Sequence, residues 1–181
     1  MSVVRAVRVL VSLAFVACVS WPGVTAASDT GHGVIASFEG GWINLAEGWG
    51  EATACTSDGI TTACYRTEAE MNAASNPVVG ASARSLAIVP LLTCASSLKL
   101  YRSTSFTGAV LQLTSRGVYT NLSTYGFDND TSSYQVGACT SYFYDGASGG
   151  TPLYPGTTTA NSSATSMLTG WDNRVSSVYI G

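Results

Sequence analysis

The chain has 181 residues, which is enough for one domain with a sizeable core. Charged residues make up only 10%, the formal net charge is −3 and there is a single histidine. This composition offers no basic surface for nucleic acid and few groups for acid–base catalysis. Solubility must instead come from Ser, Thr, Asn and Gly, which suits a β-rich extracellular protein.

An export signal is predicted at the N-terminus. Arg5 and Arg8 precede an apolar run over residues 9–21, and small residues at 24–26 suit cleavage before residue 27. The run is too short for a membrane span, which takes about 20 residues. We therefore predict a signal peptide over residues 1–26 and a secreted, extracellular mature protein. The alternative is a lipoprotein anchored through Cys18, in a sequence that loosely resembles a lipobox.

Removal of the signal peptide leaves four cysteines, Cys55, Cys64, Cys94 and Cys139. An even number in an exported protein indicates two disulfides, with three possible pairings. We favour Cys55–Cys64, which would close a hairpin around a turn dipeptide, and Cys94–Cys139, which would join the entrances of two repeats. A thiolate metal site is the alternative, but zinc usually takes close Cys-x-x-Cys pairs and several histidines, whereas the chain has no such pair and a single histidine.

A small subdomain is predicted over residues 27–77. Short strands are expected at 34–36, at 42–45 and in the cysteine hairpin, because glycines interrupt any helical pattern. Residues 78–93 show no clear period and are predicted to connect this subdomain to the repeat domain.

One helix is predicted at the end of the subdomain. Thr67 and Glu70 form a capping box that begins it, and Asn76-Pro77 ends it. Glu51, Glu68 and Glu70 could be taken as a carboxylate site. We expect them instead to lie near the positive end of the helix or in solvent.

Two stretches near the C-terminus repeat one another: residues 126–137 (GFDNDTSSYQVG) and 170–181 (GWDNRVSSVYIG). They share Gly, Asp, Asn, Ser, Ser and Gly in register, and an aromatic residue follows each first glycine. Upstream, residues 101–108 and 143–150 each begin with an aromatic residue and end with glycine. A period near 40 residues predicts two supersecondary units that bury their apolar faces against each other.

Short strands separated by turn residues predict that each unit is a Greek key. The predicted fold is therefore mainly β, a sandwich of two Greek keys over residues 94–181, preceded by the hairpin-plus-helix subdomain. Key 1 covers about 94–138 and key 2 about 139–181.

The aromatic-to-glycine openings, combined with DNDTSS at 128–133 and DNRVSS at 172–177, resemble the βγ-crystallin fold and its microbial calcium-binding members in particular. The resemblance covers about residues 94–181. It implies that the two hexapeptide loops lie side by side and bind calcium through oxygen atoms. Residues 38–71 resemble a module of secreted actinobacterial proteins, and this second likeness implies no activity.

The resemblance also implies which groups bind calcium. Asp128 and Asp172 would supply side-chain oxygens, Asp130 and Arg174 backbone carbonyls, and Ser132 and Ser176 hydroxyls. Calcium takes six to eight oxygen ligands in flexible geometry, so these are suitable groups. The cation of Arg174 weakens the local field, so we expect the shell that uses it to be the weaker one. The alternative is a metal-free structural corner, because Asx and Ser side chains also bond to nearby amides.

No enzymatic activity is expected, because the sequence has no Ser-His-Asp order, no metal-binding His pair and no phosphate-binding glycine loop with lysine. We predict a secreted, monomeric calcium-binding protein with no nucleic-acid partner and no membrane partner in the mature form. The alternative is a peptidase inhibitor or killer-toxin-like antimicrobial protein of the same fold. Such a protein would present residues 144–161 to a secreted protease or a cell-surface target.

Overall fold

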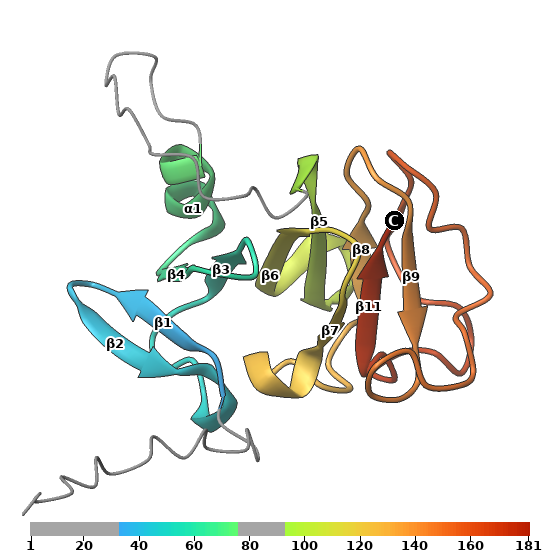
Figure 1. Cartoon of the computed structure of the whole chain (residues 1–181), viewed down its shortest axis with the longest axis horizontal. Helices are drawn as coiled ribbons and strands as arrows, with labels where there is room; N and C mark the ends of the chain where they lie inside the picture. Colours follow the sequence, from blue (N-terminus) through green and yellow to red (C-terminus); the bar gives the residue numbers. More distant parts are fainter. Residues whose placement is uncertain (1–32, 76–92) are drawn as a thin grey trace, which may run out of the picture. The chain divides into compact units, whose positions relative to one another are not determined.

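A computed structural model of the chain describes residues 33–75 and 93–181 (Figure 1). The predicted signal peptide with Cys18, the Asn76-Pro77 helix end and almost all of the 78–93 connection lie outside the described residues. No helix in the two described ranges is long and apolar enough to cross a membrane.

The described residues form strands in two sheets, one α-helix and short 3-10 turns. The elements are β1 (Ile35–Phe38), β2 (Gly41–Asn44), β3 (Ala54–Ser57), β4 (Thr62–Tyr65), α1 (Glu68–Ser75), β5 (Thr93–Ser103), β6 (Thr107–Ser115), β7 (Tyr119–Asn121), β8 (Ser133–Gln135), β9 (Ser141–Tyr144), β10 (Ser163–Ala164) and β11 (Ser177–Ile180). The larger, 8-stranded sheet has the order β10-β8-β5-β6-β3-β4-β1-β2, and the 3-stranded sheet has the order β7-β11-β9.

Each half of the repeat domain gives one strand to the sheet of the other half. In key 1, β5 pairs with β6 and β8, while β7 pairs with β11 of key 2. In key 2, β9 pairs with β11, while β10 pairs with β8 of key 1. This connectivity confirms the predicted fold class, which is mainly β with two Greek keys packed as a sandwich.

The main core lies between the two sheets, where alternate residues of each strand point inward. Leu100 of β5, Leu111 of β6, Phe143 of β9 and Val178 of β11 are all buried in one cluster. Tyr134 of β8 meets the ring of Phe143 edge-on, with the centroids 5.0 Å apart. The aromatic contact therefore joins the two sheets directly, because one ring comes from each.

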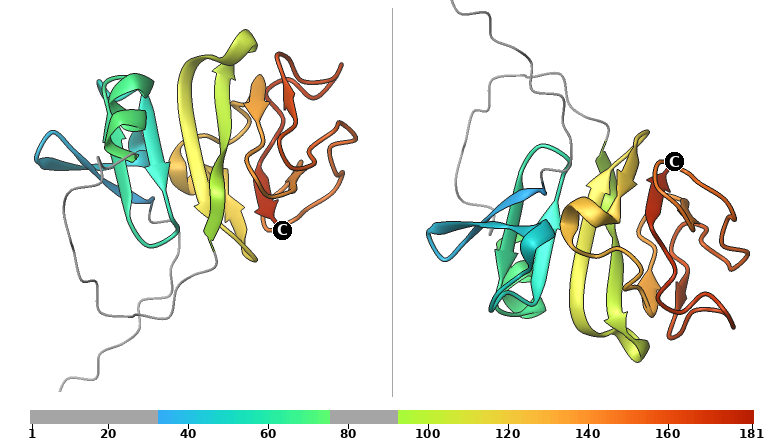
Figure 2. Two further views of the ribbon diagram at one scale, coloured as in Figure 1. Left: turned by 90° about the horizontal axis from the view of Figure 1, so that it is seen from above. Right: turned by 90° about the horizontal axis from the view of Figure 1, so that it is seen from below.

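Helix α1 packs near the opposite face of the larger sheet, next to β3 and β4 (Figure 2). Its Met71 is buried with Tyr101 and Val110, which lie on the face of the sheet that points away from the main core. The capping box is confirmed, because Glu70 N donates to Thr67 Oγ1 at 3.2 Å and Thr67 N donates to Glu70 Oε2 at 3.3 Å. The helix therefore begins where the sequence predicts.

The N-terminal strands continue the larger sheet. Strand β3 pairs in parallel with β6, from Ala54 opposite Val110 to Ser57 opposite Leu113. The described residues, 33–75 and 93–181, accordingly belong to one compact unit. The division of the chain into a 27–77 subdomain and a 94–181 domain stays a prediction.

Both favoured disulfides are present. Cys55–Cys64 links the paired strands β3 and β4, with 4.1 Å between the Cα atoms. Cys94–Cys139 links the start of β5 to the segment before β9, with 5.9 Å between the Cα atoms. The second bridge thus ties the entrances of the two keys together, as predicted.

Candidate metal-binding loops

The two hexapeptide loops, residues 128–133 and 172–177, lie against each other. Asn129 N donates to the carbonyl of Val175 at 3.0 Å, and Asn173 N donates to the carbonyl of Thr131 at 3.0 Å. The same hydrogen bond therefore runs in both directions, so the loops are related by an approximate twofold axis. The family resemblance implies this juxtaposition, and the backbone contacts show it.

The first serine of each loop reaches the other loop. Ser132 Oγ donates to Asn173 Oδ1 at 3.2 Å, and Ser176 Oγ donates to Asn129 Oδ1 at 3.3 Å. At two places, a hydroxyl oxygen and an amide oxygen from different keys are therefore close enough to bind one ion together.

Asn129 and Asn173 are site residues that the sequence analysis missed. Both have a left-handed backbone, with φ of 53° and 54°, a conformation that asparagine tolerates better than most residues. This backbone turns each amide side chain toward the opposite loop. The signal was available, because the same asparagine stands in the same place in both repeats.

The second serine of each loop has a structural role instead. Ser133 Oγ donates to the carbonyl of Ser103 at 2.6 Å and accepts from Phe106 N at 3.1 Å. Ser177 Oγ likewise donates to the carbonyl of Gly146 at 2.5 Å and accepts from Gly149 N at 3.0 Å. Each of these serines fixes the folded connection that follows the first strand of its own key.

The register also corrects one predicted correspondence. The spacing to glycine matches Tyr101 with Phe143, but Ser132 N donates to the carbonyl of Tyr101 and Ser176 N to that of Tyr144, both at 2.8 Å. Tyr101 and Tyr144 are therefore the equivalent residues. The error is one residue, because the connection between tyrosine and glycine is one residue shorter in key 2.

The charged residues at the third loop position are held in ion pairs. Asp130 Oδ2 lies 2.6 Å from Arg102 Nε, and Arg174 Nε lies 2.6 Å from Asp145 Oδ2. Partial burial raises the pKa of the Asp130 carboxyl, and the charge of Arg102 opposes that shift. Both side chains are thus engaged elsewhere, which leaves the backbone carbonyls of Asp130 and Arg174 as the groups that could serve a metal.

The aromatic residues before the two loops anchor them in the core. Phe127 is fully buried and Trp171 is nearly so. The guanidinium of Arg102 lies over the rings of Trp49 and Phe127, at 4.9 Å and 5.1 Å, and Arg174 lies over Trp171 at 5.2 Å. Each arginine therefore gains a cation–π contact beside its carboxylate.

The donor set fits calcium better than zinc. Among the described residues, no group of three or more His, Cys, Asp or Glu side chains gathers to hold a metal. A site here would use hydroxyl, amide and carbonyl oxygens, helped by the exposed residues Asp128 and Asp172. Calcium accepts such ligands, whereas zinc prefers nitrogen and sulfur. Few carboxylates imply a modest affinity, because calcium affinity depends on the charge of the ligands.

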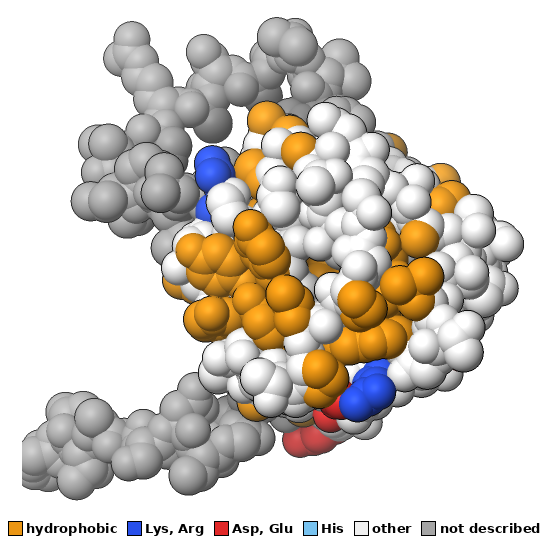
Figure 3. Space-filling model, turned by 90° about the vertical axis from the view of Figure 1, so that its right-hand side faces the viewer, with side chains coloured by type: hydrophobic (Ala, Val, Ile, Leu, Met, Phe, Trp, Pro, Cys, Tyr) orange, Lys and Arg blue, Asp and Glu red, His pale blue; other side chains and the backbone are white. Residues whose placement is uncertain are grey.

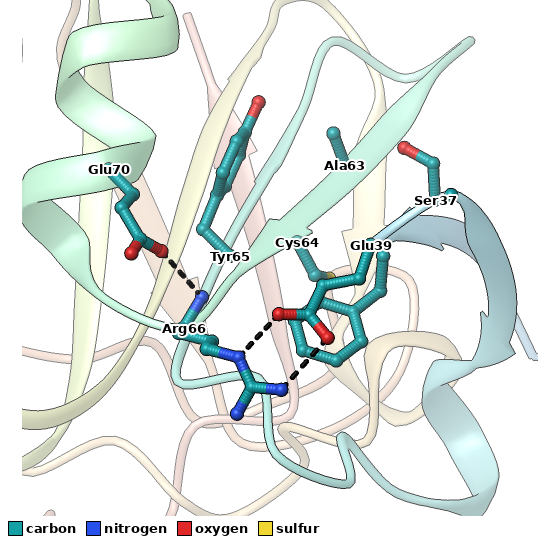
Figure 4. Close-up of a pocket in the computed structure, with 9 residues that line it drawn as sticks. Ser37, Glu39, Ala63, Cys64, Tyr65, Arg66 and Glu70 are labelled. Carbon is teal, nitrogen blue, oxygen red and sulfur yellow. Dashed lines mark hydrogen bonds and ion pairs between the residues drawn. The ribbon is translucent and has the colours of Figure 1, made fainter.

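The acids of the N-terminal strands do not form a catalytic pair. A 290 Å³ pocket is lined by Glu39, Arg66 and Glu70 among others, and Figure 4 shows the carboxylate of Glu39 bonded to the guanidinium of Arg66. Glu51 also pairs with Arg66, at 2.6 Å. Hydrogen bonding to Arg66 lowers the pKa of Glu39, although slight desolvation opposes the shift. Glu39 and Glu51 thus share the guanidinium of Arg66, and Asp145 pairs with a different arginine.

No protein-family model and no curated protein matches the chain. Several solved structures are similar to about half of it. A βγ-crystallin from Ciona intestinalis is 24% identical, with a TM-score of 0.40, and the match covers 48% of this chain and 100% of that one. A double mutant of a βγ-crystallin domain from Clostridium beijerinckii is 20% identical, with a TM-score of 0.40, and the match covers 48% of this chain and 97% of that one. A βγ-crystallin domain from Flavobacterium johnsoniae is 22% identical, with a TM-score of 0.37, and the match covers 46% of this chain and 92% of that one.

Proposed function

We propose that the protein is a secreted, non-enzymatic calcium-binding protein, and that calcium stabilises it by joining the two Greek keys. The observation that carries this proposal is the reciprocal contact of the loops. Ser132 meets Asn173 and Ser176 meets Asn129, so each candidate site draws oxygens from both keys.

Two crossed sites follow from this geometry. One would use the Ser132 hydroxyl and the Asn173 amide oxygen, and the other the Ser176 hydroxyl and the Asn129 amide oxygen. The six predicted ligands are Asp128, Asp130, Ser132, Asp172, Arg174 and Ser176, of which Asp130 and Arg174 would contribute carbonyls. Low-charge oxygen shells of extracellular modules bind calcium with Kd on the order of 10⁻⁴–10⁻³ M.

Binding across the two keys requires the folded state, so calcium should stabilise the protein. A tenfold excess of calcium over Kd contributes about 1.4 kcal/mol per site. For a domain of this size, such a gain raises Tm by roughly 3–6 °C.

Calorimetric titration of the mature chain with calcium tests the proposal. We expect about two ions per chain and loss of the heat in the Ser132→Ala/Ser176→Ala double variant with the fold retained. Ser123→Ala, at an exposed serine outside both loops, is the matched control. Unchanged heat in the double variant, or no heat in the parent chain, would contradict calcium binding at these loops.

A peptidase inhibitor is the second candidate function. Within the predicted 144–161 stretch, Leu153 is 48% exposed in a segment that pairs with the end of β9, opposite Tyr144. Asp145 N donates to the carbonyl of Pro152 at 3.0 Å, and Tyr154 N donates to that of Phe143 at 2.8 Å. Such a fixed segment reduces the entropy lost on binding a protease. Nanomolar inhibition of a secreted serine or metalloprotease, weakened by Leu153→Ala, would favour this candidate over calcium binding alone.

A further inference from the structure

Three tyrosines form a row across the outer face of the 3-stranded sheet. Tyr179 of β11 lies directly opposite Tyr119 of β7 on one side and Tyr142 of β9 on the other. The ring centroids are 5.1 Å and 6.3 Å apart. Tyr144 joins the row, with its ring centroid 5.7 Å from that of Tyr119. We call these four residues the tyrosine row.

The tyrosine row is exposed. Tyr119 is 50% exposed and Tyr142 40%, while Tyr144 and Tyr179 are partly buried. Figure 3 views the molecule from the side on which β9 and β11 lie in Figure 1, and it shows hydrophobic side chains gathered in patches on that side. Contiguous apolar surface of this kind marks interaction sites in soluble proteins.

Backbone contacts hold the rings in place. A Cβ atom added at Gly149 would lie 2.5 Å from Cε1 of Tyr119, so this ring rests on the glycine backbone. A Cβ atom at Gly181 would lie 3.6 Å from the ring of Tyr142 and 4.0 Å from that of Tyr179. The ring of Tyr119 is therefore held before a ligand arrives, which reduces the entropy cost of binding.

The three strands contribute no charged side chain to this face, and Arg116 at its edge donates to the carbonyl of Gly181 at 2.8 Å. Strands β7, β9 and β11 contain no Asp, Glu, Lys or Arg. Desolvation and the neighbouring tyrosines raise the pKa of Tyr144, so its hydroxyl stays neutral at neutral pH. Asp145, the next residue in the chain, is neutralised by Arg174 at 2.6 Å. A charged ligand would find no counter-charge on these strands.

A hollow of 330 Å³ opens beside Tyr119. Its lining includes Val118, Thr120, Asn121 and Thr124, and no charged residue is part of it. Thr124 Oγ1 donates to the Asn121 carbonyl at 2.8 Å. The row thus ends next to hydroxyl and amide groups, which can exchange hydrogen bonds with a polar but uncharged ligand.

We propose that the tyrosine row binds a single chain of an uncharged β-linked glucan. The equatorial substituents of β-linked glucose leave flat strips of C–H bonds that pack on aromatic faces, while the sugar hydroxyls match the tyrosine hydroxyls and the hollow. The row spans two strand spacings, roughly 10 Å, which is the length of about two sugar rings. Neighbouring rings are tilted by 48° and 49°, so they follow a twisted single chain and not a flat crystal surface.

Titration of the mature chain with cellohexaose, in EDTA so that calcium plays no part, tests this proposal. We expect binding that Tyr179→Ala weakens at least about tenfold, as expected when one stacked ring is lost. Tyr179→Phe keeps the ring and should bind almost normally. Trp42→Ala, at a tryptophan 75% exposed on β2 of the other sheet, is the control and should change nothing.

Maltohexaose provides the matched ligand, because its α-linked chain coils and presents no extended C–H strip. We expect it to bind at least about tenfold more weakly. If Tyr179→Ala fails to fold by near-UV circular dichroism, the exposed Tyr119→Ala and Tyr142→Ala variants replace it. Three results would overturn the proposal: no cellohexaose binding at millimolar concentration, equal binding of maltohexaose, or a chain dimer that Tyr119→Ala dissolves, since a second copy would then be the occupant.

Discussion

The two loops share one backbone but carry opposite charges at the same place. In key 1, Arg102 follows the tyrosine of β5 and pairs with Asp130 of the loop. In key 2, Asp145 follows the equivalent tyrosine of β9 and pairs with Arg174 of the loop. The ion pair is thus present in both keys with its polarity reversed.

This reversal indicates that the two keys keep the same backbone geometry and the same ion-pair contact, whichever of the two partners carries the positive charge. The surroundings of the two pairs nevertheless differ. Both arginines donate to the carbonyl of the glycine that begins their repeat, Arg102 to Gly126 at 2.8 Å and Arg174 to Gly170 at 3.3 Å. Arg102 also stacks on Trp49, whose Nε1 donates to the carbonyl of Tyr125 at 2.7 Å. Key 1 is therefore linked to the N-terminal strands through its arginine, whereas the arginine of key 2 stacks only on the tryptophan of its own loop among the described contacts.

Truncation of the loop anchors should have the largest effect. Phe127→Ala should lower the free energy of unfolding by about 3–5 kcal/mol, and Trp171→Ala by roughly 3 kcal/mol, because Phe127 also supports Trp49 and Arg102. Urea unfolding measures both. Ile60→Ala, at a side chain 72% exposed, is the control and should stay within about 0.5 kcal/mol. Equal losses at the two anchors would show that the link to the N-terminal strands adds no stability.

Removal of the arginine should cost more stability in key 1 than in key 2. Arg102→Met should cost about 1–2 kcal/mol, because it loses contacts with two rings as well as a partly buried carboxylate. Arg174→Met should cost about 0–1 kcal/mol, since its guanidinium lies over one ring only and its side chain is more exposed than that of Arg102, at 44% against 32%. Double-mutant cycles with Asp130→Asn and Asp145→Asn isolate the pairwise terms. Identical values for the two arginines would contradict the difference drawn between the keys.

Local and periodic patterns made much of this structure predictable. The Thr67–Glu70 capping box and both disulfides follow from short motifs and cysteine spacing, whereas the meeting of the two loops was implied by the family resemblance. The parallel pairing of β3 with β6 was not predicted, because strands joined in this way carry no turn signal between them.

The site was predictable in outline but not in its contacts. The sequence indicates the serines, whereas the hydrogen bonds of Asn129 and Asn173 depend on a left-handed backbone that only the paired loops reveal. The tyrosine row was missed for a similar reason. Tyr119, Tyr142 and Tyr179 come from three separate strands, and only the cross-strand register brings their rings together.

Making loop 2 as acidic as loop 1 should strengthen calcium binding. Arg174→Asp replaces a cation by a carboxylate and also frees Asp145, so the local field becomes more negative. For charges several ångströms away in water this change is worth about 1 kcal/mol, or roughly fivefold in Kd. Calorimetry measures it. Arg116→Asp makes the same change in net charge outside both loops and should give a smaller gain; an equal gain would mean that net charge alone decides the affinity.

The smallest effect should be a pH dependence that belongs to key 1. Because partial burial raises the folded-state pKa of Asp130 above 3.8, the folded chain holds this proton more tightly than the unfolded chain. The contribution of Asp130 to stability is therefore fully present below pH 3.8 and is lost as the pH rises through the folded-state pKa. The stability difference between the parent chain and Asp130→Asn should fall over this window, and urea unfolding at a series of pH values measures it. In Arg102→Met the fall should extend to higher pH, because the opposing cation is gone. A difference that instead grows with pH would show that the pairing with Arg102 outweighs burial, which would make the two ion pairs more alike than their surroundings suggest.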